Sequence, residues 1–193
     1  MQTTNPISAH GGYRKLLSYQ TSEIIYDFTV EFCKKYISYK SRTIDQMVQA
    51  ARSGKQNIAE GSQVSGTSKK TELKLISVAR GSLEELLQDY EDFLRQHSLE
   101  IWGKDDRRAK TIRTLAYLTN RSYETYKSYM ETTESAANCA LCLLHQANFL
   151  LEKQLRSLEK AFLVNGGFTE NLYQKRKDYQ KQNGNFMFGP ENK

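Results

Sequence analysis

The sequence has little of the material that builds turns, sheets or cross-linked folds. Of its 193 residues only 2 are proline and 3 are cysteine, and no apolar run approaches the roughly 18 residues that a membrane-spanning helix needs. So little proline disfavours a sheet of short strands, and the three cysteines, Cys33, Cys139 and Cys142, fit reduced thiols better than a disulfide framework. The first residues also lack the basic and then apolar layout of a secretion signal. We therefore expect a cytoplasmic protein that does not cross a membrane.

Positive charge is the first indication of function. The chain has 28 basic and 22 acidic residues, a formal net charge of +6 at pH 7. The excess is concentrated in residues 101–130, which carry 7 basic and 3 acidic side chains. A basic surface makes a polyanion such as nucleic acid a reasonable partner, although a solvated lysine-rich surface has the same composition.

Apolar residues recur at three- and four-residue spacing along four long segments, which is the period of one face of an α-helix. This spacing predicts long helices over 15–40, 44–62, 68–97 and 138–162, and shorter helices over 105–118 and after Thr169. Gly166 and Gly167 mark the end of the last long helix, because glycine accepts the left-handed conformation of a helix C-terminus.

The predicted fold class is all-α, an antiparallel up-and-down four-helix bundle with an additional short helix and a C-terminal extension. The expected organisation is a flexible arm over 1–13, a single bundle domain over 14–183 and a flexible tail over 184–193.

Two features of the second and third helices suggest how they pack. Gly54 and Gly61 lie on the apolar stripe of the second helix, where small residues allow a neighbouring backbone to approach closely. Arg80 falls on the apolar stripe of the third helix, and Glu60 is a candidate ion-pair partner if the two helices are antiparallel. Asn57, Glu60 and Arg80 are expected to form a structural polar core.

Two motifs carry a resemblance to a known family. They are Asn57-Ile58-Ala59-Glu60-Gly61, which follows Asp45-Gln46, and Ala79-Arg80-Gly81-Ser82-Leu83-Glu84-Glu85-Leu86. Over about residues 15–100 the chain resembles the four-helix-bundle proteins of 23S ribosomal RNA intervening sequences, which are related to the accessory variability determinant of diversity-generating retroelements. The resemblance implies a small basic bundle that assembles into a homopentamer and has no catalytic activity. For the retroelement branch it also implies binding of nucleic acid and of a reverse transcriptase.

Other motifs favour structural readings. The glycines of Gly61–Ser68 have the spacing of a phosphate-binding loop, but Thr67 stands where that loop needs lysine, and a helix precedes it instead of a strand. Cys139, Cys142 and His145 would supply three zinc ligands without a fourth. No histidine sits in a constellation for acid–base or nucleophilic work, so we expect neither an enzyme nor a cofactor.

The remaining aromatic motif has two readings. Tyr123, Tyr126 and Tyr129, with basic neighbours, could form a platform for unstacked bases. A better-favoured reading is that one edge of these tyrosines packs on the bundle.

Together these patterns favour a non-enzymatic, self-associating protein that binds RNA or DNA with little sequence specificity. The wide apolar faces of the long helices suggest self-association, for example Leu75, Leu86, Phe93, Leu143 and Leu150. The alternative is a protein-interaction scaffold with no role in binding nucleic acid. The residues expected to contact phosphates are Lys69, Lys70, Lys74, Arg107, Arg108, Lys110 and Arg113.

Overall fold

The computed structural model describes residues 10–183, and every regular element in that range is a helix. The predicted all-α class is therefore confirmed for this part of the chain. The predicted tail and most of the predicted arm lie outside the described residues. In chain order the elements are η1 (Tyr13–Lys15), α1 (Leu17–Tyr36), α2 (Thr43–Val64), α3 (Lys69–Gln96), α4 (Arg107–Thr114), η2 (Leu115–Tyr117), α5 (Tyr123–Tyr126), η3 (Lys127–Glu131), α6 (Thr133–Asn165) and α7 (Phe168–Asn183).

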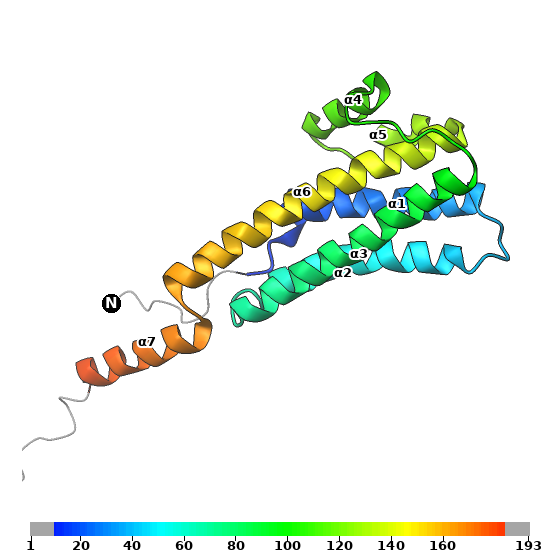
Figure 1. Cartoon of the computed structure of the whole chain (residues 1–193). Helices are drawn as coiled ribbons and strands as arrows, with labels where there is room; N and C mark the ends of the chain where they lie inside the picture. The colour runs from blue at the N-terminus through cyan, green and yellow to red at the C-terminus, as the bar shows by residue number, and fades with distance from the viewer. Residues whose placement is uncertain (1–9, 184–193) are drawn as a thin grey trace, which may run out of the picture.

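The four long helices α1, α2, α3 and α6 make the body of the molecule. α1 packs against α2 and α6, and α3 packs against the same two helices. Figure 1 shows that successive long helices run in opposite directions and that α4 and α5 lie beside one end of α6. None of the helices in residues 10–183 is long and apolar enough to cross a membrane.

The inward faces of these helices fill one apolar core. Phe28 and Phe32 of α1 and Tyr90 of α3 are completely buried, and the Phe32 and Tyr90 rings meet edge to face with centroids 4.8 Å apart. The Tyr90 hydroxyl donates to Thr29 Oγ1 at 3.1 Å, so its one polar group is satisfied inside the core. Burial raises the pKa of Tyr90 well above its ordinary value, and the side chain stays neutral.

Among the long helices, the boundaries differ most from the prediction at the end of α1 and the start of α6. α1 ends at Tyr36, because Ile37 takes an extended conformation, and Tyr39 is 84% exposed. α6 begins at Thr133, five residues earlier than predicted, and the Thr132 side chain accepts a hydrogen bond from the Ser135 backbone N–H. At its other end α6 stops where predicted, since Gly166 has a positive φ of 68°.

The segment Gly61–Ser68, whose glycine spacing is that of a phosphate-binding loop, forms the end of α2 and the turn to α3. α2 continues through Gly61 as far as Val64, and the Ser68 side chain caps α3 by accepting from the Thr71 backbone N–H at 3.2 Å. Gly11, in the described end of the predicted arm, donates its backbone N–H to the carbonyl of Ser62 at 3.1 Å.

Several apolar residues from which self-association was predicted are buried inside the chain itself. Leu86 and Phe93 of α3 and Leu143 of α6 lie in the core, so they offer no surface to a second copy. The exposed apolar residues lie elsewhere. Near the end of α6, Leu163 is 77% and Val164 73% exposed, and in α7 Leu172 is 43% and Tyr173 59% exposed.

α2 and α3 approach each other closely at two glycines, as their place on the α2 stripe indicated. A Cβ atom added to Gly54 would lie 2.5 Å from Cδ2 of the fully buried Leu83, and one added to Gly61 would lie 3.3 Å from Cδ1 of Ile76. Leu83 thus occupies the space that a side chain at position 54 would need.

We predict that Gly54→Ala destabilises the protein although alanine is the better helix former. Overpacking against Leu83 should cost about 1–3 kcal/mol, against a gain in helix propensity of roughly 1 kcal/mol. Gly81→Ala is the matched control, because an added Cβ there meets nothing within 4 Å, and it should stabilise α3 by about 0.5–1 kcal/mol. Urea denaturation of both variants measures the difference. Equal effects at the two positions would contradict this packing.

Candidate functional site

The structure divides the cations predicted to contact phosphates into two groups. Lys69, Lys70 and Lys74 lie in the first turns of α3, whereas the α4 group follows the far end of α3. The 28 residues of α3 span about 42 Å at roughly 1.5 Å per residue. The two groups therefore belong to opposite ends of the body and do not form a single surface.

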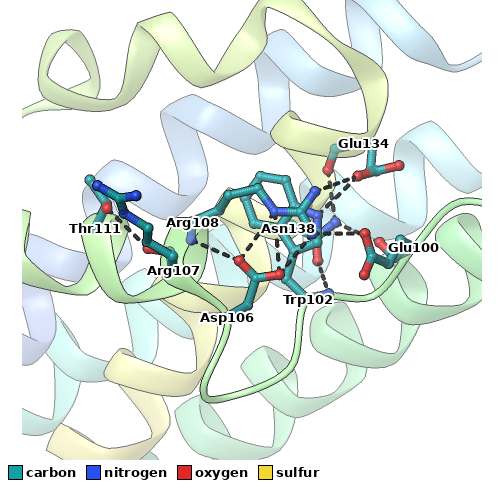
Figure 2. A network of polar contacts seen from close by, with 8 residues as sticks. All are labelled: Glu100, Trp102, Asp106, Arg107, Arg108, Thr111, Glu134 and Asn138. Carbon is teal, nitrogen blue, oxygen red and sulfur yellow. Dashed lines mark hydrogen bonds and ion pairs between the residues drawn. The ribbon is translucent and has the colours of Figure 1, made fainter.

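Arg108 is committed to a network of contacts within the chain (Figure 2). Its Nη2 lies 2.7 Å from carboxylate oxygens of both Glu100 and Asp106, and its Nη1 lies 3.3 Å from Glu134 Oε1. The guanidinium carbon lies 4.3 Å from the ring centroid of Trp102, a cation–π distance. With three acidic partners, Arg108 is engaged within the chain, and a phosphate contact at this residue stays a prediction that would require exchange of these ion pairs.

The same network joins α6 to the segment before α4. Asn138, only 2% exposed, accepts from the Trp102 backbone N–H at 2.8 Å and donates to the carbonyls of Glu100 and Glu134 at 2.8 and 2.9 Å. The Trp102 indole donates to Glu134 Oε1 at 3.0 Å. These contacts hold residues 100–102 on the first turns of α6 and so place α4 above that helix.

Asp106 connects the network to α4 itself. Its side chain caps the helix by accepting from the Arg108 backbone N–H at 2.7 Å. Hydrogen bonding from the Arg108 side chain is the main cause that lowers the pKa of Asp106. A carboxylate with a lowered pKa stabilises the fold above its ordinary pKa, and that contribution is lost as the pH falls through the lowered value.

The other cations of α4 differ in how many ion pairs and hydrogen bonds they make within the chain. Lys110 lies 3.1 Å from Asp105, and Arg113 Nη2 donates to the Lys104 carbonyl at 2.6 Å. Arg107 is exposed, and among the described residues no carboxylate lies within ion-pair distance of it. At the start of α3, Lys69 pairs with Glu72 at 3.0 Å, whereas Lys70 and Lys74 are exposed and, within residues 10–183, unpaired.

The predicted polar core of Asn57, Glu60 and Arg80 is not formed. Arg80 points away from α2, is half exposed and lies 3.3 Å from Glu152 of α6, and Glu60 is exposed. The reason is the path of the apolar stripe along α3, since Ala79 and not Arg80 faces the core between Ile76 and Leu83.

Asn57 is partly buried, and its side chain stays local to α2. Its Nδ2 donates to the Ser53 carbonyl at 2.9 Å. The polar contact that joins α2 to α3 here is made by the Ser53 and Ser82 hydroxyl groups, 2.9 Å apart.

The cysteines and the tyrosines at positions 123, 126 and 129 lie in the apolar core or pack against it. Burial raises the pKa of Cys139 well above its ordinary value and that of Cys33 to about 12, so both thiols stay protonated. Within residues 10–183 no three metal-ligating side chains are grouped around a common point. Tyr126 is fully buried, and Tyr123 and Tyr129 pack against the core, which confirms the packing interpretation of these tyrosines.

The helix predicted after Thr169 is α7, which projects from the end of α6 and carries a basic surface that was not among the predicted phosphate contacts. In Figure 1, α7 extends away from the body, and every side chain from Thr169 to Gln182 is exposed. Its cations are Lys175, Arg176, Lys177 and Lys181. The run of three successive basic residues in 175–177 was the available signal.

Comparisons with other proteins find no relative. No family model matches the chain, and neither a curated protein nor a solved structure is significantly similar to it.

We predict that Arg108→Ala lowers the melting temperature, because it removes the guanidinium that three carboxylates and Trp102 share. Arg107→Ala, its neighbour without an ion pair, is the control and should leave the melting temperature unchanged. Differential scanning fluorimetry at pH 7 compares the two. If Arg108→Ala melted at the same temperature as the unaltered protein, the network would not contribute to stability.

Proposed function

We propose that this protein is a non-enzymatic, oligomeric helical protein that binds nucleic acid through phosphate contacts with little sequence specificity. In this proposal α1, α2, α3 and α6 form an antiparallel up-and-down four-helix bundle of the type found in the intervening-sequence proteins. The observation that carries the proposal is α7, a basic helix whose side chains from Thr169 to Gln182 are exposed in the described part of the chain.

The chemistry of α7 suits a polyanion. It has four cations against two acids, Glu170 and Asp178, and none of its cations lies within ion-pair distance of a carboxylate of the described chain. Unpaired, solvated lysine and arginine side chains neutralise phosphates and release counterions. Tyr173, 59% exposed with Lys177 Nζ 4.8 Å from its ring centroid, adds an aromatic face on which an unpaired base can stack.

A helix such as α7 also needs a partner for stability. It has 16 residues, and isolated helices of about this length are marginal in water because tertiary packing normally supplies most helical stability. A phosphate backbone laid against the Lys175–Lys177 side chains would stabilise the helix in proportion to the contacts formed.

We predict that binding to labelled single-stranded RNA weakens steeply with salt and depends on α7. Reversal of Lys175, Arg176 and Lys177 to Glu should lower affinity at least tenfold. It should also reduce the slope of log K against log salt by about 2, because each phosphate contact on a single strand contributes roughly 0.7. Fluorescence anisotropy at several salt concentrations gives both quantities, and single-stranded and duplex DNA are measured in parallel.

A matched triple reversal at Lys104, Arg107 and Lys110 separates the two ends of the molecule. It leaves Arg108 and its acidic partners in place, so the fold should persist, and affinity should fall less than in the α7 variant. A larger loss in the α4 variant would move the site to α4. If neither variant changed the affinity, nucleic-acid binding through these cations would be excluded, and the protein-scaffold function would take its place.

Self-association is part of the proposal, and the turn from α6 to α7 is the surface that supports it. Leu163 and Val164 are each more than 70% exposed there, and Leu172 and Tyr173 follow on the next helix. A cluster of exposed apolar side chains is typical of a protein-interaction surface. The resemblance to the intervening-sequence proteins implies a homopentamer.

We predict that Leu163→Glu with Val164→Glu lowers the mass measured by light scattering at tens of micromolar, because two charges at the contact resist desolvation. Leu118→Glu is the control, since Leu118 is 52% exposed and lies on a different part of the surface. A monomeric mass for the unaltered protein would overturn the oligomer proposal.

A further inference from the structure

A long groove lies on the outer face of α6, at the end of the molecule that carries α4. Its floor is one face of α6 between Asn138 and Lys153, a length of about 22 Å at roughly 1.5 Å per residue. Its walls come from residues 101–121, from the start of α1 at Leu17 and from Glu91 of α3. The cavity volume is about 830 Å³, within the range of sites that hold small molecules.

Several of the exposed apolar side chains of the protein border the groove. Leu17 is 56% exposed, Ile101 48%, Tyr117 89% and Phe149 57%, and all four border it. Leu141, buried in the floor, continues the apolar lining. A concentration of this kind on one concave surface marks a binding site.

The charge around the groove has one dominant sign. Lys104, Arg113, Arg121 and Lys153 border it, and Glu91 is the one acidic side chain in the lining. An apolar groove with this excess of cations is complementary to an anion that carries an apolar portion.

Among these four cations, Arg121 has a guanidinium group whose hydrogen-bonding capacity is poorly satisfied within the described chain. Its Nη2 donates to Thr21 Oγ1 at the long distance of 3.5 Å, and its Nη1 is buried with no hydrogen-bond partner in the described chain. The neighbouring Tyr126 hydroxyl is buried beside this guanidinium. Burial raises the pKa of Tyr126, and hydrogen bonding and charge from Arg121 offset part of that rise. Buried donors without acceptors destabilise a fold, and a carboxylate is the acceptor that a guanidinium binds best.

We propose that this groove binds a linear amphipathic carboxylate of the fatty-acid type, with its carboxylate at Arg121 and its hydrocarbon chain against Leu141 and Phe149. A floor about 22 Å long, at roughly 1.5 Å per residue from Asn138 to Lys153, favours a linear chain over a compact ring system. This site is separate from α7 and does not depend on nucleic-acid binding.

Trp102 gives a direct readout, because it is the one tryptophan of the sequence and borders the groove. The full-length protein is titrated with dodecanoate below its critical micelle concentration, and the tryptophan emission is followed. Dodecyltrimethylammonium, with the same chain length and opposite charge, is the matched ligand. We expect a saturable change with dodecanoate and an affinity at least tenfold weaker for the cation.

Two variants test the assigned contacts. Arg121→Gln removes the carboxylate partner, and Phe149→Glu places an opposing charge on an exposed position where folding should be preserved, which circular dichroism verifies. Each should weaken dodecanoate binding at least tenfold. Arg156→Gln is the control, since Arg156 is an exposed α6 cation paired with Glu152 and does not border the groove, and it should bind as the unaltered protein does.

Three outcomes would overturn the proposal. The first is equal affinity for the two amphiphiles, which would indicate unspecific apolar adsorption. The second is dodecanoate binding that survives in folded Phe149→Glu as well as in Arg121→Gln. The third is a tryptophan signal that changes with protein concentration and not with dodecanoate, which would mean that a second copy of the chain covers the groove.

Discussion

The close contact of α2 with α3 determines the orientation of the elements that follow. Because Gly54 has no side chain, Leu83 occupies the space beside the α2 backbone, and this contact holds the α3 face through Ala79 and Leu83 toward the core. Arg80 lies outside that face and reaches Glu152 of α6. Glu84, one turn later, accepts from Asn148 at 2.9 Å. The packing of α3 on α2 is thus linked to the polar contacts that α3 makes with α6.

At the other end of the molecule, α4 is held by apolar and polar contacts together. Ala109 and Ile112 are its buried residues, and Ile112 belongs to the core. Arg108, Asn138 and their acidic partners hold the preceding segment on α6. The groove lies between α6 and the 101–121 segment that this polar network anchors.

The sequence indicated the elements better than their rotations and long-range partners. Periodicity at three and four residues identified the long helices, and Gly166 identified the end of α6, because these are local properties. The same periodicity fits two α3 stripes that share Ile76 and Leu83, one through Arg80 and one through Ala79, and tertiary packing decides between them. The partners of Arg108 lie as far along the chain as Glu134, so the basic run suggested a free surface where the structure has an ion-pair network. The groove, made from separate segments, had no local signal.

The exposure of α7 has a consequence for any molecule that binds it. Because every side chain from Thr169 to Gln182 is exposed, little tertiary packing supports the helical form, and helices of this length are marginal without such packing. A partner that recognises the helix binds only the fraction that is helical, and its apparent affinity is reduced by that fraction. Substitutions that raise helix propensity in α7, without changing a contact residue, would then tighten binding. The helix–coil equilibrium of this segment therefore sets the apparent affinity for the partner.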